Sequence, residues 1–206
     1  MGADKKEATT KEIIMEAAET EFLEKGFSNA KTTAIAARAK VTHAMLHYYF
    51  GTKLNLFQTV FNNKIQFIAD HLILKKEQNL TFFEIIEDLI RSHFDFFSQN
   101  IRLVTFIYNE MVVSTENRNV LLKILQPKFV SVLAKIEPLM EEEILRGVIH
   151  PVKPIYLLLN IVSINITTFM IFPLIKDVYL SDEEYDRLLK ERKESNVRFI
   201  MHALKK

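Results

Sequence analysis

The run from Ile155 to Ile175 restricts the fold of this chain more than any other feature, because none of its 21 residues carries a charge. A helix of that length can cross a bilayer, and its many Leu, Ile, Phe and Met side chains disfavour full exposure to water. Polar residues nevertheless interrupt the run, Lys153 and Lys176 flank its two ends about equally, and the sequence holds no second run of this kind. We therefore expect a helix buried on most sides within a folded protein, with a membrane span as the alternative.

The composition excludes several common classes of enzyme. With 206 residues, 49% of them hydrophobic, the chain can bury a sizeable core. It has no Cys and therefore no thiolate zinc site, and its four Gly residues lie too far apart to build a glycine-rich phosphate-binding loop. Residues 1–10 are charged and show no export or lipid-attachment signal, so we expect a cytoplasmic protein.

Apolar residues recur at helical spacing along the whole chain, and no sustained alternation predicts a sheet. The expected fold class is therefore all-α. The predicted helices span approximately residues 10–25, 32–39, 42–50, 53–76, 81–99, 101–114, 117–146, 155–172 and 182–204. Pro127 and Pro138 are expected to kink the long helix that contains them.

Several positions predict how particular helices begin or end. Gly26 lies where a left-handed residue would end the first helix. Thr32 or Thr33 can cap the second helix, and Thr42 can cap the third. The last helix begins with the run from Ser181 to Glu184, which has the Ser-x-x-Glu form of a capping box.

Charge is distributed unevenly near the N-terminus. Residues 1–24 contain three Lys and seven acidic residues, whereas residues 25–53 contain five basic residues and no acidic one. Residues 25–53, called the basic segment below, also contain the two short predicted helices. This excess of positive charge favours docking against a polyanion, although a solvated surface explains most short clusters of like charge.

The spacing within the basic segment is typical of a helix-turn-helix. Such a motif needs a small residue where the two helices cross, an apolar residue in the turn and apolar anchors under the second helix. These places are filled by Ala36, Val41, Leu46 and Phe50. The opposite side of the second helix then presents small or hydrogen-bonding groups, which suit a groove of DNA. These groups belong to Thr42, His43, Ala44, His47 and Tyr48.

A long, spaced pattern runs through residues 13–57. It consists of Ala17-Ala18, Phe22, Lys25-Gly26-Phe27, Thr32, Ile35-Ala36, Ala39, Val41-Thr42, Leu46, Tyr48-Tyr49-Phe50, Lys53 and Leu56. This pattern resembles the N-terminal domain of the TetR family of transcriptional regulators. The chain departs from the family at three positions, with Lys40 in place of the usual Gly, Met45 in place of Thr and His47 in place of Tyr. A left-handed Lys40 would cost about 1 kcal/mol unless the turn relaxes.

The resemblance implies a three-helix, DNA-binding helix-turn-helix domain over residues 1–52. It implies a larger helical domain over residues 53–206 for effector binding and dimerisation. Phosphate contacts at the start of the motif's first helix would come from Thr32 and Thr33. Base edges would be contacted by Thr42, His43, Ala44 and Met45, and further phosphates by His47, Tyr49 and Lys53.

Simpler roles are open for three of these residues. Thr32 and Thr42 can be helix caps, a role that is compatible with DNA contact. Tyr49 can belong largely to the core, because Leu46 and Phe50 flank its side of the helix.

One short recognition helix supplies little specificity, so we expect a homodimer that reads a palindromic operator in double-stranded DNA. The dimer surface is expected on the two C-terminal helices, residues 155–172 and 182–204. A four-helix bundle between subunits would cover the uncharged run without lipid.

The resemblance also implies a ligand pocket among the central helices, which are unusually rich in Phe. Polar residues inside apolar stretches, and one Phe, are the candidates for binding a small apolar or amphipathic effector. They are His71, Phe106, Asn109, Asn160 and Thr167. An ordinary core explains any single Phe, and hydrogen bonds across the dimer explain the polar positions equally well.

The sequence predicts neither an enzyme nor a cofactor or metal site. His43 and His47 have the i, i+4 spacing of zinc ligands, but no third ligand is evident. His93 and Asp95 are two residues apart and so do not share a helical face. We predict a TetR-like regulator, a repressor that an effector releases from its operator. The alternatives are a helical small-molecule carrier or membrane-associated protein, and an α-helical enzyme.

Overall fold

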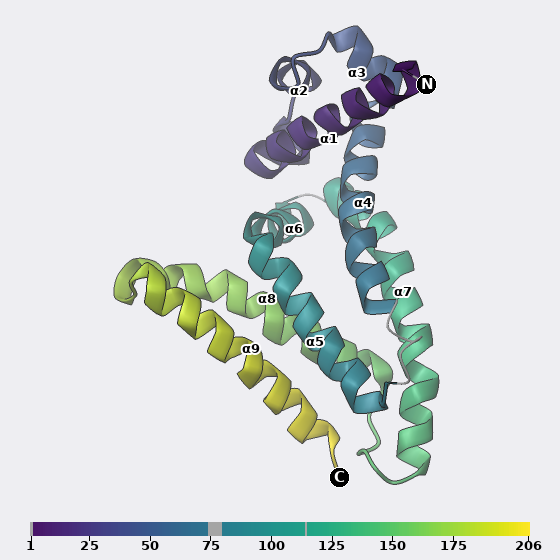
Figure 1. Cartoon of the computed structure of the whole chain (residues 1–206), viewed down its shortest axis with the longest axis vertical. Coiled ribbons are helices and arrows are strands. Elements are labelled where there is room, and N and C mark those ends of the chain that lie inside the picture. Colours follow the sequence, from purple (N-terminus) through teal and green to yellow (C-terminus); the bar gives the residue numbers. More distant parts are fainter. Residues whose placement is uncertain (1, 74–79, 114) are drawn as a thin grey trace. The chain divides into compact units, whose positions relative to one another are not determined.

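The computed structural model describes residues 2–73, 80–113 and 115–206, with side chains described for residues 9–64, 80–112 and 115–206. This part of the chain forms nine helices and no strand apart from an isolated bridge between Ile149 and Lys205, which confirms the all-α fold class. The helices are α1 (Gly2–Asn29), α2 (Thr32–Arg38), α3 (His43–Phe50), α4 (Lys53–Ile73), α5 (Phe82–Gln99), α6 (Ile101–Val113), α7 (Thr115–Leu145), α8 (Pro154–Tyr179) and α9 (Asp182–Leu204) (Figure 1).

The helices belong to two compact units. The first unit comprises the chain up to residue 66 together with residues 106–126, and the second comprises residues 67–105 and 127–206. The helix-turn-helix formed by α2 and α3 therefore lies in the first unit, whereas α5, α8 and α9 lie in the second. The division into functional domains at residues 52 and 53 stays a prediction.

Aromatic rings from α1, α4 and α6 form the core of the first unit. Phe22 is fully buried and meets Phe57 edge-on, with 5.1 Å between the ring centroids. Phe61 stacks on Phe106 with a centroid separation of 4.9 Å and an interplanar angle of 6°. Each such pair contributes about 0.5–1.5 kcal/mol beyond the apolar area that it buries. The cluster thereby fixes the end of α1 against the helices that follow the helix-turn-helix.

Helix α1 is longer than predicted and is interrupted near its end. It begins at Gly2 rather than near residue 10, since the Ala, Lys and Glu residues that precede Thr10 favour a helix. Gly26 has a positive φ of 75°, but its ψ of 165° lies outside the left-handed helical region, so the predicted left-handed cap at Gly26 is wrong and the helical assignment continues to Asn29. Only glycine adopts these angles readily, so Gly26 separates the long part of α1 from a last turn over residues 27–29.

The turn between α2 and α3 places a residue other than glycine in the left-handed region. The Val41 N–H donates to the Ala36 carbonyl at 3.0 Å, and the Lys40 N–H donates to the Ala37 carbonyl at 3.1 Å. These two bonds define a Schellman motif, which places the residue after the cap in the left-handed region. Lys40 has φ 55° and is the one non-glycine residue with positive φ in the described chain. The turn does not relax, and Lys40 adopts the strained conformation.

Helix α7 contains two internal prolines. Its helical assignment runs from Thr115 to Leu145 and includes both Pro127 and Pro138. Each proline leaves the carbonyl four residues earlier without its usual donor. Both prolines are exposed, so water can solvate the carbonyls on that side of the helix.

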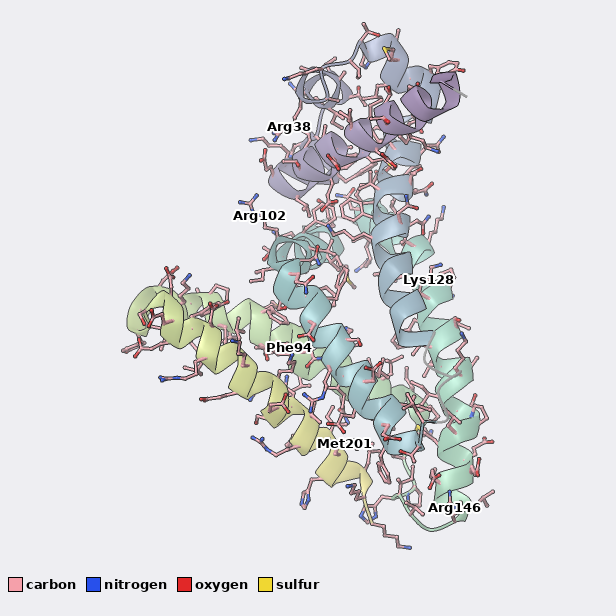
Figure 2. The ribbon with its side chains drawn as sticks, viewed as in Figure 1. Arg38, Phe94, Arg102, Lys128, Arg146 and Met201 are labelled. Carbon is pink, nitrogen blue, oxygen red and sulfur yellow. The ribbon has the colours of Figure 1, made fainter. Side chains whose placement is uncertain are left out.

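Helices α5, α8 and α9 lie side by side in the second unit (Figure 1). Their buried faces share one apolar cluster with α7, which includes Ile86 of α5, Ile136 of α7, Ile161 of α8 and Ile200 of α9. Figure 2 labels Phe94 on α5, whose ring lies 4.8 Å from the ring of Phe169 on α8. The predicted capping box is confirmed at the start of α9, which therefore begins at a defined residue.

Helix α8 contains the uncharged run and has two different faces. One face, with Leu157, Ile161 and Phe169, is buried in the second unit. The other face is exposed and changes along the helix from the small polar residues Asn160, Ser163 and Thr167 to apolar residues. Those apolar residues are Met170, Ile171, Leu174, Ile175, Val178 and Tyr179. By length and composition α8 could cross a membrane, a property that core helices of soluble proteins also have, and no other helix among the described residues passes this test.

Candidate nucleic-acid interface

Helix α3 presents one face to the core and one to solvent, as the sequence predicts. Leu46 and Phe50 are buried beneath it. Thr42 caps the helix, because its side-chain oxygen accepts the Met45 N–H at 3.2 Å. The exposed positions are Thr42, His43, Ala44, Met45, His47 and Tyr48. The predicted base-contacting residues of this helix therefore form one accessible surface.

A polar contact joins the start of α2 to the start of α3. The Thr32 hydroxyl lies 2.9 Å from Nε2 of His43, and the rings of His43 and His47 meet edge-on with 4.6 Å between centroids. Thr32 is already inside α2, whose cap position is occupied by Lys31 without a side-chain bond. The prediction that Thr32 or Thr33 caps α2 is therefore wrong, and Thr32 instead orients His43.

Lys53 makes contacts that the sequence did not predict. Its Nζ donates to the carbonyls of Ser28 at 3.1 Å and Ala30 at 3.2 Å, and it lies 4.9 Å from the centre of the Phe27 ring. The side chain is half-buried rather than exposed. Lys53 thus binds the chain that connects α1 to α2, and its predicted contact with phosphate stays a prediction.

The basic segment keeps much of its charge at the surface. Arg38 bonds to Glu24 at 2.8 Å and lies 3.5 Å from Glu21, so acidic residues of α1 offset its charge (Figure 2). Lys31 and Lys40 are exposed, and Thr33 is exposed beside them. Tyr49 is half-buried next to the exposed Tyr48. Part of its side chain therefore packs in the core, and the rest is accessible for contact with DNA.

Sequence reasoning missed two buried polar residues near the interface, Glu110 of α6 and Asn117 of α7. Their exposed fractions are 6% and 5%. Glu110 accepts the Phe27 N–H at 2.9 Å and the Asn117 side-chain amide at 2.5 Å. The available signal was that Glu110 is the only acidic residue in the stretch of residues 101–113.

The predicted effector-binding residues have different surroundings. Phe106 is buried in the aromatic core of the first unit, whereas Asn109 is exposed on α6. Asn160 and Thr167 are exposed on α8 in the second unit. His71 lies outside the residues whose side chains are described. The role of all five in binding an effector stays a prediction.

The polar residues that are buried in the second unit lie elsewhere. His93 of α5, Asn165 of α8 and Asn196 of α9 form a chain of hydrogen bonds, with 3.1 Å between Nδ1 of His93 and Nδ2 of Asn165 and 2.9 Å between the two amides. Burial lowers the pKa of His93 to about 4, so this ring is neutral at pH 7. Asp95 instead pairs with Lys193 at 2.8 Å, which agrees with the prediction that His93 and Asp95 face different ways.

Metal-binding chemistry finds no support in the described residues. They contain no group of three or more His, Cys, Asp or Glu side chains that could hold a metal ion.

Comparison with known proteins finds relatives of the N-terminal region of this chain. Residues 14–60 match the model of the bacterial regulatory proteins of the tetR family. A segment of 68 residues is 35% identical to the HTH-type transcriptional repressor BepR of Brucella suis biovar 1. That match covers 33% of this chain and spans about a third of the repressor, 32% of its length. Residues 14–60 of this chain are thus similar to the helix-turn-helix domain of the tetR family of bacterial regulatory proteins.

Solved structures of similar fold extend the likeness over almost the whole chain. FadR of Bacillus subtilis, solved in complex with stearoyl-CoA, is 19% identical to this chain and has a TM-score of 0.68. The match covers 90% of this chain and 96% of the FadR chain. A TetR/AcrR family regulator from Thermobifida fusca is also 19% identical, with coverages of 91% and 96% and a TM-score of 0.65. At these identities the likeness shows the fold alone.

Proposed function

We propose that this protein is a cytoplasmic, homodimeric transcriptional repressor that binds a palindromic operator and is released from it by a small, mostly apolar effector. The observation that carries the proposal is the exposed face of α3 within a tetR-family helix-turn-helix. Residues 1–52 would bind DNA, and residues 53–206 would bind the effector and form the dimer. The name of BepR supports the repressor role by analogy.

The exposed groups of α2 and α3 suit both kinds of DNA contact. Thr33 and the lysines of the basic segment would bind phosphates, which carry most of the affinity. His43, held by Thr32, would read a base edge in the major groove, because a fixed imidazole can accept or donate one directed hydrogen bond. Ala44 and Met45 would add apolar contacts, for example with a thymine methyl group.

The exposed face of α8 supports the proposed dimer. Leu174 and Val178 are 67% and 66% exposed, and Phe199 of α9 is 65% exposed. Exposed apolar side chains one turn apart on a helix, as Leu174 and Val178 are, mark an interaction surface. A second copy of α8 and α9 would complete a four-helix bundle, in which Asn160 and Thr167 could form hydrogen bonds between subunits.

A charge introduced into this face tests the dimer. The variant Leu174→Glu should sediment as a monomer, because a carboxylate cannot be buried against apolar residues without a partner. The control variant Leu122→Glu changes a leucine on α7 that is 42% exposed, and it should remain a dimer. A dimer of unchanged stability for Leu174→Glu would remove α8 from the interface.

The effector proposal is supported by the FadR structure, whose ligand is stearoyl-CoA. Stearoyl-CoA is therefore a suitable first probe, with free CoA as the control for its polar part. Binding in the larger domain would shift the population of states that differ in the separation of the two recognition helices. Because two half-sites need fixed spacing along the duplex, such a shift would release DNA.

Selection from a random duplex pool tests the DNA-binding proposal. The purified protein should enrich an inverted repeat, and the affinity for the selected duplex should fall steeply as salt is raised. A pool that shows no enrichment at low salt would contradict the proposal and favour the carrier or membrane-associated alternative.

A further inference from the structure

The link between α1 and α2 is a short turn held from two sides. We call residues 26–30 the 26–30 turn. In a continuous helix the Phe27 N–H would bond to the carbonyl four residues earlier, but the backbone at Gly26, with φ 75° and ψ 165°, directs it away. The Phe27 N–H donates instead to Oε1 of Glu110, 83 residues later in the chain, at 2.9 Å.

The carboxylate of Glu110 fits this place closely. Its second oxygen accepts the Asn117 side-chain amide at 2.5 Å, and that amide also donates to the Ser28 hydroxyl at 3.1 Å. Both oxygens of the buried carboxylate thus have donors, as a buried charge requires. A Cβ atom at Gly26 would come within 2.6 Å of Oε1, so the approach of the carboxylate requires glycine there.

The other end of the 26–30 turn is held by a positive group. Lys53 donates to the Ser28 and Ala30 carbonyls at 3.1 and 3.2 Å. The carboxylate of Glu110 on α6 therefore binds an N–H of this turn, and the ammonium group of Lys53 on α4 binds two of its carbonyls. Lys31, the N-cap residue of α2, follows this turn directly, so the turn determines where the helix-turn-helix starts.

We propose that Glu110 and Asn117 are positioning residues for operator binding, which act by fixing the 26–30 turn and hence the orientation of α2 and α3. This inference rests on the proposed function. Both residues lie in the segment 106–126 of the first unit, and the chain continues from each end of that segment into the second unit.

The test uses the full-length protein and the palindrome selected by the wild type. Three variants are compared: Glu110→Ala removes the acceptor, Glu110→Gln keeps one amide oxygen for the Phe27 N–H, and Glu116→Ala changes an exposed acid of α7 as the control. Each protein is titrated against duplexes whose half-sites have the selected spacing or are moved apart by one or two base pairs. The amide signal of Phe27 is followed by NMR hydrogen exchange.

Glu110→Ala should bind the selected spacing about tenfold more weakly than the wild type and should lose most of the preference among spacings. Its Phe27 amide should exchange faster, whereas Glu110→Gln should recover most of both properties and Glu116→Ala should match the wild type. A purely structural role would lower the active fraction or the melting temperature and leave the spacing preference unchanged.

If the wild type does bind a selected operator, two results would still overturn the positioning role of Glu110 and Asn117. One is an unchanged spacing preference in Glu110→Ala, and the other is equal behaviour of Glu110→Ala and Glu116→Ala. If the wild type enriches no sequence, the proposed function is wrong and the inference falls with it.

Discussion

Replacing Lys40 by glycine should stabilise this protein. Lys40 has φ 55°, and its N–H and that of Val41 form the Schellman bonds that end α2. A left-handed L-residue costs about 1–2 kcal/mol. Glycine removes that cost but loses about 0.5–1 kcal/mol more conformational freedom on folding. The difference predicts a gain of about 0.5–1 kcal/mol and, for a chain of this size, a rise in melting temperature of about 2 °C.

Thermal unfolding followed by circular dichroism measures this effect, with Lys40→Ala as the matched control. Alanine removes the same charge and the same long side chain, but it keeps the Cβ atom and therefore the strain. The glycine variant should melt above both the wild type and the alanine variant. If the glycine variant melts at or below the temperature of the alanine variant, the left-handed turn is not a source of strain and the reasoning is refuted.

Three further predictions concern single residues. His43→Ala should change the base preference at one position in each half-site of the selected duplex, and a uniform loss of affinity without a new preference would count against base reading. Lys53→Ala should weaken binding to all duplexes and reduce the magnitude of the slope of log affinity against log salt by about 0.9. An unchanged slope with a lower melting temperature would mean that Lys53 does not contact phosphate and only binds the Ser28 and Ala30 carbonyls. The free energy of unfolding should fall as pH drops from 6.5 to about 4. In this range His93 binds a proton in the unfolded chain, whereas its buried ring stays neutral in the folded protein. The loss amounts to about 3 kcal/mol. His93→Gln should flatten this part of the stability curve, and a curve that keeps its wild-type shape would contradict the burial argument.

Local rules predicted the elements whose cause lies within a few residues. Thr42 caps α3 because the required group and the backbone it serves are neighbours in the chain. For Lys40 the sequence left two outcomes open, a relaxed turn or a left-handed residue, and the structure shows the left-handed one. The predicted cap of α2 was Thr32 or Thr33, but the cap residue is Lys31 and Thr32 is the first residue of the helix. Helix ends are difficult to place to within one residue.

Contacts between distant residues were not predictable from the same rules. The carbonyls bound by Lys53 lie more than twenty residues earlier in the chain, and the partner of Glu110 lies 83 residues away. Both contacts depend on how α4 and α6 pack, which the spacing of apolar residues does not define. The search for polar residues inside apolar stretches likewise selected Asn160 and Thr167 but did not identify Asn165, whose amide bonds to Asn196 inside the second unit.

The most direct test of the account compares the selected palindrome with a duplex in which one half-site is scrambled. A homodimer that reads both half-sites should form a complex with two chains per duplex and bind the palindrome at least about 10³-fold more tightly than unrelated DNA. Scrambling one half-site should remove most of that advantage. A complex with one chain per duplex and equal affinity for both duplexes would contradict the central claim that two copies of α3 read one operator together.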